Sequence, residues 1–163
     1  MRYESPTTTK AAVALLSGEK GQAYVLAGGT DLLVRLRMDT IEPDLMVDIK
    51  RIPAMSDVTK TASGFKIGAA VPGAALDKNK ALVKAWPGVV EAANLIGSDQ
   101  IQGRCTMVGN LCNASPAADS VPALIAAGAK AIIVGKKKRT VPVEKFVTGP
   151  GQTCLEKGEI VEA

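Results

Sequence analysis

Residues 25–37, VLAGGTDLLVRLR, join an apolar run to an amphipathic segment through two adjacent glycines and a Thr-Asp pair. The apolar run predicts a buried strand over 24–26, and the segment after it predicts a helix over 31–37. Glycine lets another group approach the backbone closely, and successive exposed N–H groups at such a turn form an anion-binding concavity. A phosphate would fit here, although an ordinary strand-to-helix turn capped by Thr30 or Asp31 explains the same residues.

The elements around this glycine turn, residues 27–31, predict a small parallel unit. A further strand is expected in DLMVDI, residues 44–49, so the order is strand, crossover helix, strand. Before the unit, residues 7–17 predict a short helix that stops at Gly18. The turn matches neither GxGxxG nor GxxxxGK[ST], so it is not a Rossmann or Walker loop.

Beyond residue 53 the pattern changes to a mixture of helices and strands. Residues 58–71 predict two strands around a Ser-Gly turn, and residues 72–97 predict helix that is interrupted near Pro87. The single tryptophan, Trp86, is expected in the core. We therefore expect an α+β chain of two lobes, 1–53 and 54–163.

The end of the chain predicts a helix, a hairpin and one more strand. Residues 121–129 predict the helix, residues 131–143 predict the hairpin, and the last residues begin a strand for which the sequence offers no partner.

Between the two groups of elements lies a polar segment, residues 100–120, QIQGRCTMVGNLCNASPAADS, which is expected to be irregular. Its hydroxyl, amide and carboxylate groups can bind a polar ligand, and Asp119 can accept hydrogen bonds from ribose hydroxyls. Ser115 is also expected to cap the next helix, with Pro116 in its first turn.

The composition indicates a globular protein with few catalytic side chains. Hydrophobic residues make up 47 % of the 163 residues, whereas aromatic residues make up 3 % and are too few for stacking on single-stranded nucleic acid. Histidine is absent, which excludes Ser-His-Asp, Cys-His and HExxH sites. A cofactor is therefore expected to carry any reaction.

Charge and cysteine content argue against further classes. The basic run over 136–139 lies between two predicted strands and indicates a solvated hairpin turn, not a nucleic-acid interface. The three cysteines, Cys105, Cys112 and Cys154, form no CxxC pair and indicate packed, reduced thiols of a cytoplasmic protein. We expect neither a signal peptide nor a membrane span.

Two motifs together carry a resemblance: LAGGTDL over 26–32, and IGSDQIQGRCTMVGNLCNASPAADSVPALIAAGA over 96–129. In this order they resemble the flavin-binding medium subunit of the molybdenum hydroxylases, the family of xanthine dehydrogenase and carbon monoxide dehydrogenase. The similarity runs over nearly the whole chain, from a Y-x-x-P element near the start to KKRTVPVEKFxxGPG near the end. The family's subunits continue into another domain after the GEI element, so the chain is expected to be a fragment.

The resemblance implies an FAD-binding fold of the PCMH type, similar to vanillyl-alcohol oxidase, with FAD between a small N-terminal βαβ-type lobe and a larger α+β lobe. It implies an electron-transfer subunit with no catalytic side chain and no metal ligand. Electrons would come from a large subunit with the molybdenum cofactor, through a small [2Fe-2S] subunit, and FAD would pass them to NAD, a quinone or oxygen.

The resemblance also assigns residues to the cofactor. The first turn would wrap the pyrophosphate, the polar segment would meet its other side and the ribityl or ribose hydroxyls, and three aliphatic residues would lie near the flavin ring or adenine. The expected FAD contacts are, in that order, Leu26, Ala27, Gly28, Gly29, Thr30 and Asp31; Thr106, Gly109, Asn110, Asn113, Ser115 and Asp119; and Ile101, Ile160 and Val161.

Two alternatives stay open at this point. The chain can be a stand-alone FAD-dependent oxidoreductase domain of the same fold, which would need a catalytic side chain over the flavin. It can also be a non-catalytic assembly module that has lost FAD, because Val108 stands where the family pattern T-x-G-G-N has its first glycine. A position that requires positive φ would disfavour valine.

Overall fold

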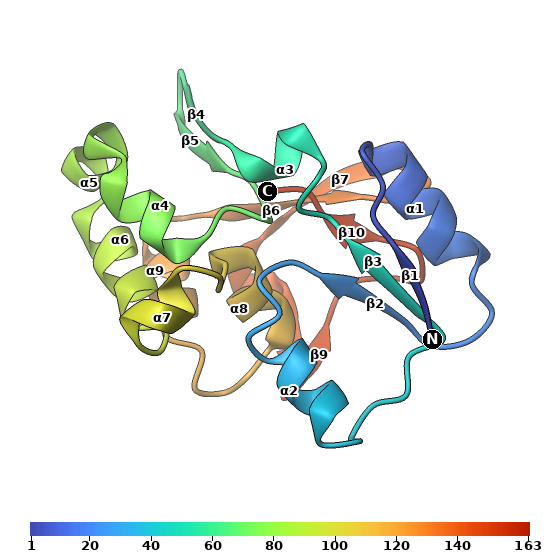
Figure 1. The fold of residues 1–163 in the computed structure, drawn as a ribbon. Helices are drawn as coiled ribbons and strands as arrows, with labels where there is room; N and C mark the ends of the chain where they lie inside the picture. The colour runs from blue at the N-terminus through green and yellow to red at the C-terminus, as the bar shows by residue number, and fades with distance from the viewer.

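The N-terminal part is a parallel sheet of three short strands. The computed structural model describes residues 1–163 and places β1 (Arg2–Glu4), β2 (Ala23–Leu26) and β3 (Leu45–Asp48) in the order β1-β3-β2 (Figure 1). The central strand β3 is buried along its whole length, as a strand flanked on both sides requires. The parallel pairing predicted from the glycine turn is confirmed, and β1 is a strand that the sequence did not indicate.

Two helices connect these strands. α1 (Thr9–Gly18) begins after Thr8, whose hydroxyl accepts a hydrogen bond from the backbone N–H of Ala11, and it begins two residues later than expected. α2 (Leu32–Arg37) starts directly after the glycine turn, and its first backbone hydrogen bond runs from Leu33 N–H to the Gly29 carbonyl.

The remainder of the chain is a hairpin, a run of helices and a final group of antiparallel strands. After α3 (Pro53–Ser56) comes the hairpin of β4 (Val58–Thr61) and β5 (Gly64–Ile67). The helices that follow are α4 (Gly73–Lys78), α5 (Lys80–Ala85), α6 (Pro87–Asn94), α7 (Asp99–Gln102), α8 (Met107–Asn113) and α9 (Ser120–Ala126). The chain ends with β6 (Lys130–Val134), β7 (Lys138–Pro142), the 3-10 turn η1 (Val143–Lys145), β8 (Val147–Gly149), β9 (Gln152–Thr153) and β10 (Ile160–Val161).

Three sequence expectations for this part are wrong. The polar segment is largely helical, because Met107 and Leu111, four residues apart, are both buried and Thr106 caps the helix that carries them. Ser115 caps no helix: its hydroxyl accepts from Ala117 N–H within a turn. The last strand does have a partner, since β10 pairs with β6 in the sheet β10-β6-β7.

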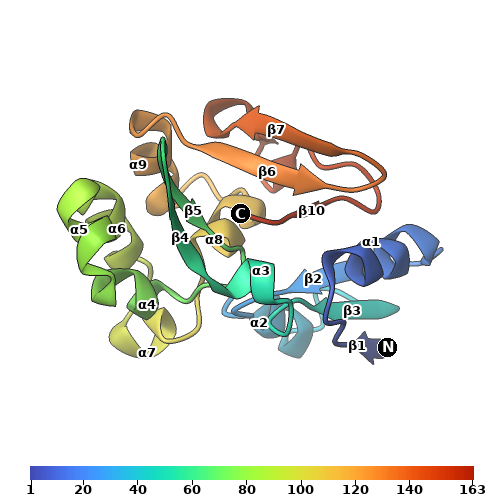
Figure 2. The same ribbon diagram turned by 90° about the horizontal axis from the view of Figure 1, so that it is seen from above.

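Three apolar clusters form the core, and α8 lies among them (Figure 2). The first cluster joins α1, β3 and α3 to Ile160 of β10, so that both ends of the chain contribute to one packed region. The second lies among α4, α5 and α6, and the third under β6 and η1. Val108 of α8 packs against the first and the third cluster.

Candidate functional site

The two glycines of the turn are there for different reasons. Gly29 has a φ of +77°, a conformation that residues with a Cβ rarely adopt. Gly28 has an ordinary φ but packs against the segment before α8, where a Cβ would overlap the carbonyl oxygen of Arg104 and lie 2.9 Å from the Cα of Cys105. Gly28 thus allows a contact within the chain, whereas the sequence alone suggested that both glycines make room for a ligand.

The glycine turn leaves its backbone donors unused. None of the N–H groups from Ala27 to Asp31 donates a hydrogen bond to any group of the chain. Buried or half-buried backbone N–H groups are otherwise almost always paired in folded proteins, so a run of free donors marks a place for an external acceptor. A diphosphate supplies such acceptors.

Side chains at the end of β3 and directly after it fix the position of the glycine turn. Lys50 Nζ lies 2.8 Å from Asp48 Oδ1 and donates to the Ala27 carbonyl oxygen at 3.1 Å. Tyr3 of β1 donates its hydroxyl to Asp48 Oδ2 at 2.5 Å. Burial raises the pKa of Asp48, but the hydrogen bonds from Lys50 and Tyr3 outweigh it and hold that pKa below its usual value. The same bond to Asp48 raises the pKa of Tyr3.

The start of α8 forms the facing side of the site. The Thr106 hydroxyl accepts from Gly109 N–H at 2.8 Å, which caps the helix and leaves the N–H groups of Met107 and Val108 without a partner in the chain. Asn110 Oδ1 accepts from the hydroxyl and the N–H of Ser120, so it fastens α9 to α8. Val108 lies inside the helix and has no positive φ, so the expected backbone penalty for valine is absent.

A cleft with a volume of about 270 Å³ lies between the glycine turn, α8 and the C-terminal strand. Of the residues expected to contact FAD, it is lined by Ala27, Gly28, Gly29, Thr30, Asp31, Thr106, Gly109, Asn110, Asn113, Ile160 and Val161. Leu26, Ile101, Ser115 and Asp119 do not line it. Sequence reasoning did not single out other lining residues, among them Tyr24, Arg35, Ile96 and Glu159.

The four residues outside the cleft have other surroundings. Leu26 is buried at the end of β2, and Ile101 is exposed on α7, next to Gly97. Asp119 is exposed directly before α9 without a side-chain hydrogen bond to it.

An ion pair fixes the charge at the C-terminal side of the cleft. The Arg139 guanidinium donates two hydrogen bonds to the Glu159 carboxylate, from Nε to Oε1 at 2.8 Å and from Nη2 to Oε2 at 2.6 Å. Glu159 also accepts from Glu156 N–H at 2.8 Å. These hydrogen bonds, led by the one from Arg139, lower the pKa of Glu159. Lys138 likewise forms an ion pair with Glu162. Two of the four residues of the basic run, Lys138 and Arg139, therefore form ion pairs within the chain.

A second cavity of about 610 Å³ lies between the β4–β5 hairpin, the helices and β6. It shares Val108 and Val161 with the cleft as lining residues. Trp86 also lines it and is 39 % exposed, so the expectation of a core tryptophan is wrong.

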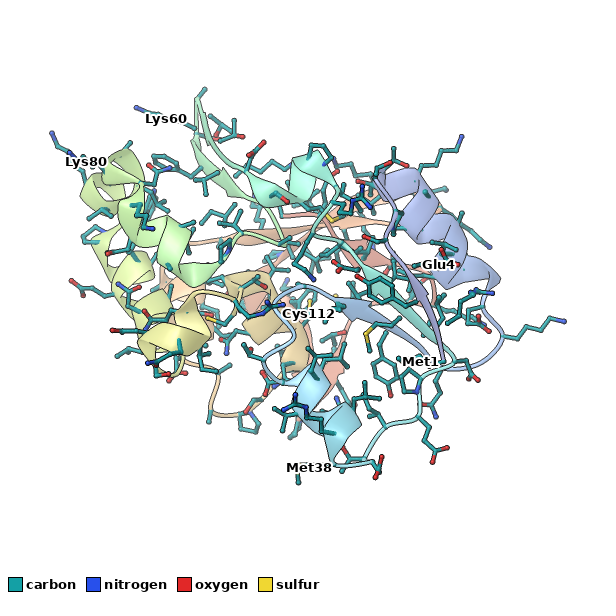
Figure 3. All side chains as sticks on the ribbon, in the orientation of Figure 1. Met1, Glu4, Met38, Lys60, Lys80 and Cys112 are labelled. Atoms are coloured by element: carbon teal, nitrogen blue, oxygen red, sulfur yellow. The ribbon has the colours of Figure 1, made fainter.

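The cysteines are free thiols. Cys105 is buried beside the glycine turn, and Cys112 of α8 lies near the centre of the molecule (Figure 3). Burial raises the pKa of Cys105 and raises that of Cys112 to about 12. These thiols are therefore weak nucleophiles, as packed side chains are. No cluster of potential metal ligands occurs, and no helix has the length and apolar character needed to cross a membrane.

Residues 1–163 match the family described as the FAD binding domain in molybdopterin dehydrogenase. The chain is 32 % identical over 160 residues to the carbon monoxide dehydrogenase medium chain of Hydrogenophaga pseudoflava, and 34 % identical over 163 residues to the xanthine dehydrogenase FAD-binding subunit of Escherichia coli O157:H7. These alignments cover 98 % and 99 % of the chain but 56 % of each relative, so the chain spans little more than half of their length.

Solved structures agree with the sequence comparison. The carbon monoxide dehydrogenase of Hydrogenophaga pseudoflava matches 99 % of the chain with a TM-score of 0.93, and the match covers 57 % of that chain. The reconstituted CO dehydrogenase of Oligotropha carboxidovorans, 28 % identical, also matches with a TM-score of 0.93 over 99 % of this chain and 57 % of its own. The predicted α+β FAD-binding fold is therefore confirmed.

Proposed function

Because the chain belongs to the family of FAD binding domains in molybdopterin dehydrogenases, we propose that it holds the FAD of an electron-transfer subunit in a molybdenum hydroxylase. In this role it accepts electrons that originate at a molybdenum centre and delivers them to an acceptor such as NAD, a quinone or oxygen. The observation that carries the proposal is the cleft, where the free N–H groups of the glycine turn face the start of α8.

The residues of the cleft fit a dinucleotide. We assign the diphosphate to the glycine turn, whose backbone donors are free, and to Thr106, Gly109 and Asn110 at the start of α8. There Thr106 offers a hydroxyl and Asn110 an amide group, and the free backbone donors are the N–H groups of Met107 and Val108, because Gly109 N–H is bonded to the Thr106 hydroxyl. We assign the remaining cofactor contacts to Asn113, Ile160 and Val161, which also line the cleft. Leu26, Ile101, Ser115 and Asp119 lie outside the cleft lining, and we do not include them in the assignment.

Bound FAD supplies the redox chemistry, and the chain supplies position and environment. Lys50 and Asp48 fix the Ala27 carbonyl, so the N–H groups of the turn keep one orientation before the cofactor arrives. Ile160, Val161 and Val108 present apolar surface to the cleft and exclude water from it. No side chain of the cleft has to act as a general base for electron transfer.

The partners in this proposal are a large subunit with the molybdenum cofactor and a small subunit with [2Fe-2S] clusters. The absence of a metal-ligand cluster in the chain is compatible with these centres lying on other subunits. Three free cysteines are compatible with a reducing compartment such as the cytoplasm.

An absorbance spectrum tests the proposal. The purified chain is recorded before and after incubation with FAD and desalting, and bands at roughly 370 and 450 nm, where oxidised flavins absorb, should remain with the protein. Circular dichroism of the same sample shows whether it is folded. A folded chain that retains no flavin after incubation would refute the proposal.

A further inference from the structure

The charged side chains that line the cleft differ in whether they have an ion-pair partner within the chain. The cleft contains three charged side chains, Asp31, Arg35 and Glu159. Arg139 neutralises Glu159 through two hydrogen bonds. Arg35 is the only cationic residue of the cleft lining, and no carboxylate lies within ion-pair distance of it.

Arg35 is held beside the glycine turn by the helix that follows the turn. Its N–H donates to the Asp31 carbonyl at 3.0 Å, one turn further back in the chain. Asp31 lies directly before α2 and four residues before Arg35, a spacing that allows an ion pair, yet none forms. Arg35 makes no side-chain hydrogen bond either. The guanidinium is therefore available to a ligand in the cleft.

A diphosphate needs more than neutral donors. It carries two negative charges at neutral pH, and the backbone N–H groups of the glycine turn and the Thr30 hydroxyl bring no full charge. The nearby carboxylate of Asp31 would repel such a ligand. A guanidinium offers two parallel donors that match phosphate oxygens and remains protonated at every working pH.

We propose that Arg35 is the cation that binds a phosphate of the dinucleotide in this cleft. The proposal deepens the proposed function and rests on it. Arg35 acts as a binding residue that selects ligands with a diphosphate over flavins that lack one, and it takes no part in electron transfer.

α2 offers a matched control for this test. Arg37 lies on the same helix, is exposed and carries the same charge, but it does not line the cleft. Arg35→Ala and Arg37→Ala therefore change net charge and helix composition equally. Arg35→Lys keeps the charge and removes the two-pronged geometry.

The experiment measures dissociation constants by calorimetry for FAD, ADP and riboflavin on the full chain and the three variants. ADP carries the diphosphate without a flavin ring, and riboflavin carries the ring without a phosphate. Arg35→Ala should raise the dissociation constants of FAD and ADP by about tenfold to a hundredfold and leave that of riboflavin unchanged. The dissociation constants of FAD and ADP for Arg35→Lys should lie between those of Arg35→Ala and the unmodified chain. Arg37→Ala should change every dissociation constant by less than about twofold. Added salt should weaken FAD binding to the unmodified chain more than to Arg35→Ala.

The outcomes separate this inference from the proposed function. If the unmodified chain binds FAD and Arg35→Ala binds it equally well, Arg35 is not the phosphate ligand and the flavin role stands. If Arg35→Ala and Arg37→Ala weaken FAD binding equally, the loss of one positive charge from the helix explains the effect and the inference is wrong. If the unmodified chain binds neither FAD nor ADP, the proposed function falls and this inference falls with it. Melting temperatures of all variants show whether any loss reflects unfolding.

Discussion

Gly28 and Arg104 lie seventy-six positions apart, and their backbones touch: a Cβ on Gly28 would overlap the carbonyl oxygen of Arg104. Arg104 Nε also donates to the Gly28 carbonyl at 3.4 Å. The turn that faces the cleft is thus also the contact between the N-terminal sheet and the helical part of the chain. Ligand binding and the packing of the two parts depend on the same residue.

Gly28→Ala should therefore disturb the fold as well as the site. The methyl group would push the backbone of Arg104 away, and overpacking of this kind costs about 1–3 kcal/mol of unfolding free energy. Urea unfolding measures the loss. Gly88→Ala is the control, because Gly88 lies in α6 with no atom near its Cβ position, and helix propensity predicts unchanged or slightly higher stability. Equal stability of Gly28→Ala and the unmodified chain would show that the contact can relax freely.

Lys50→Met should destabilise the chain at neutral pH and little at acid pH. A carboxyl group whose pKa is lowered in the folded state, as that of Asp48 is, adds stability above its unfolded pKa and loses it as the pH falls through the folded value. Removal of the Lys50 ammonium lets the pKa of Asp48 rise, so the variant should lose about 1–2 kcal/mol at pH 7. The difference should begin to shrink as the pH falls below about 4, the ordinary range of a carboxyl group, and should disappear once the pH lies below the lowered pKa of Asp48 in the unmodified chain.

Urea unfolding at several pH values checks this dependence. Lys60→Met is the control, since Lys60 lies at the exposed tip of the β4–β5 hairpin and makes no ion pair (Figure 3). A loss for Lys50→Met that is constant from pH 7 to acid pH would contradict the role of the Asp48 pair.

Glu162 should link the hairpin to the C-terminal sheet. Its carboxylate accepts from Lys66 of β5 at 3.0 Å and from Lys138 of β7 at 2.8 Å. Burial raises the pKa of Glu162, and the hydrogen bonds from the two lysines lower it further than burial raises it. Lys138 is well exposed, so Lys138→Met should cost only about 0.5–1 kcal/mol.

A double-mutant cycle isolates this interaction. The cost of Lys138→Met should disappear in a Glu162→Gln background, whereas Lys137→Met, in the neighbouring turn, should cost nothing in either background. Guanidinium chloride would screen the pair, so the unfolding free energies are measured in urea. An undiminished cost in the Glu162→Gln background would show that Lys138 stabilises the chain by other contacts.

FAD binding to Val108→Gly and to the unmodified chain distinguishes a flavoprotein from a module that has lost FAD. Because Val108 lies within α8 and packs against two core clusters, glycine should lower the unfolding free energy by about 2–3 kcal/mol. The affinity for FAD should change by less than about tenfold, or 1.4 kcal/mol. Calorimetric titration of both proteins checks this, and flavin binding that appears only in the glycine variant would instead support the loss of FAD.

The sequence was most informative where local chemistry decides structure. The glycine turn, the strand before it and the helix after it follow from a few adjacent residues, and so does the hairpin around the basic run. The helix α8 was missed because its short apolar face, Met107 and Leu111, is hidden among polar and small residues. The cap at Thr106 was the available signal.

The rest of the site depends on contacts between distant segments. No local pattern shows that Lys50 reaches the Ala27 carbonyl or that Arg139 reaches Glu159. The reason for Gly28 is likewise visible only once Arg104 is placed against it. Arg35 was overlooked because its sequence context is that of any exposed arginine on an amphipathic helix.

The position of the single tryptophan provides the molecule with an internal optical reporter. Trp86 lines the cavity that shares Val108 and Val161 with the cleft, so its indole lies in the same part of the fold as the proposed flavin position. Indole emission overlaps the near-ultraviolet absorption of a flavin, and resonance energy transfer should quench it when FAD is bound. One unlabelled chain can therefore report cofactor loading, release and exchange in real time.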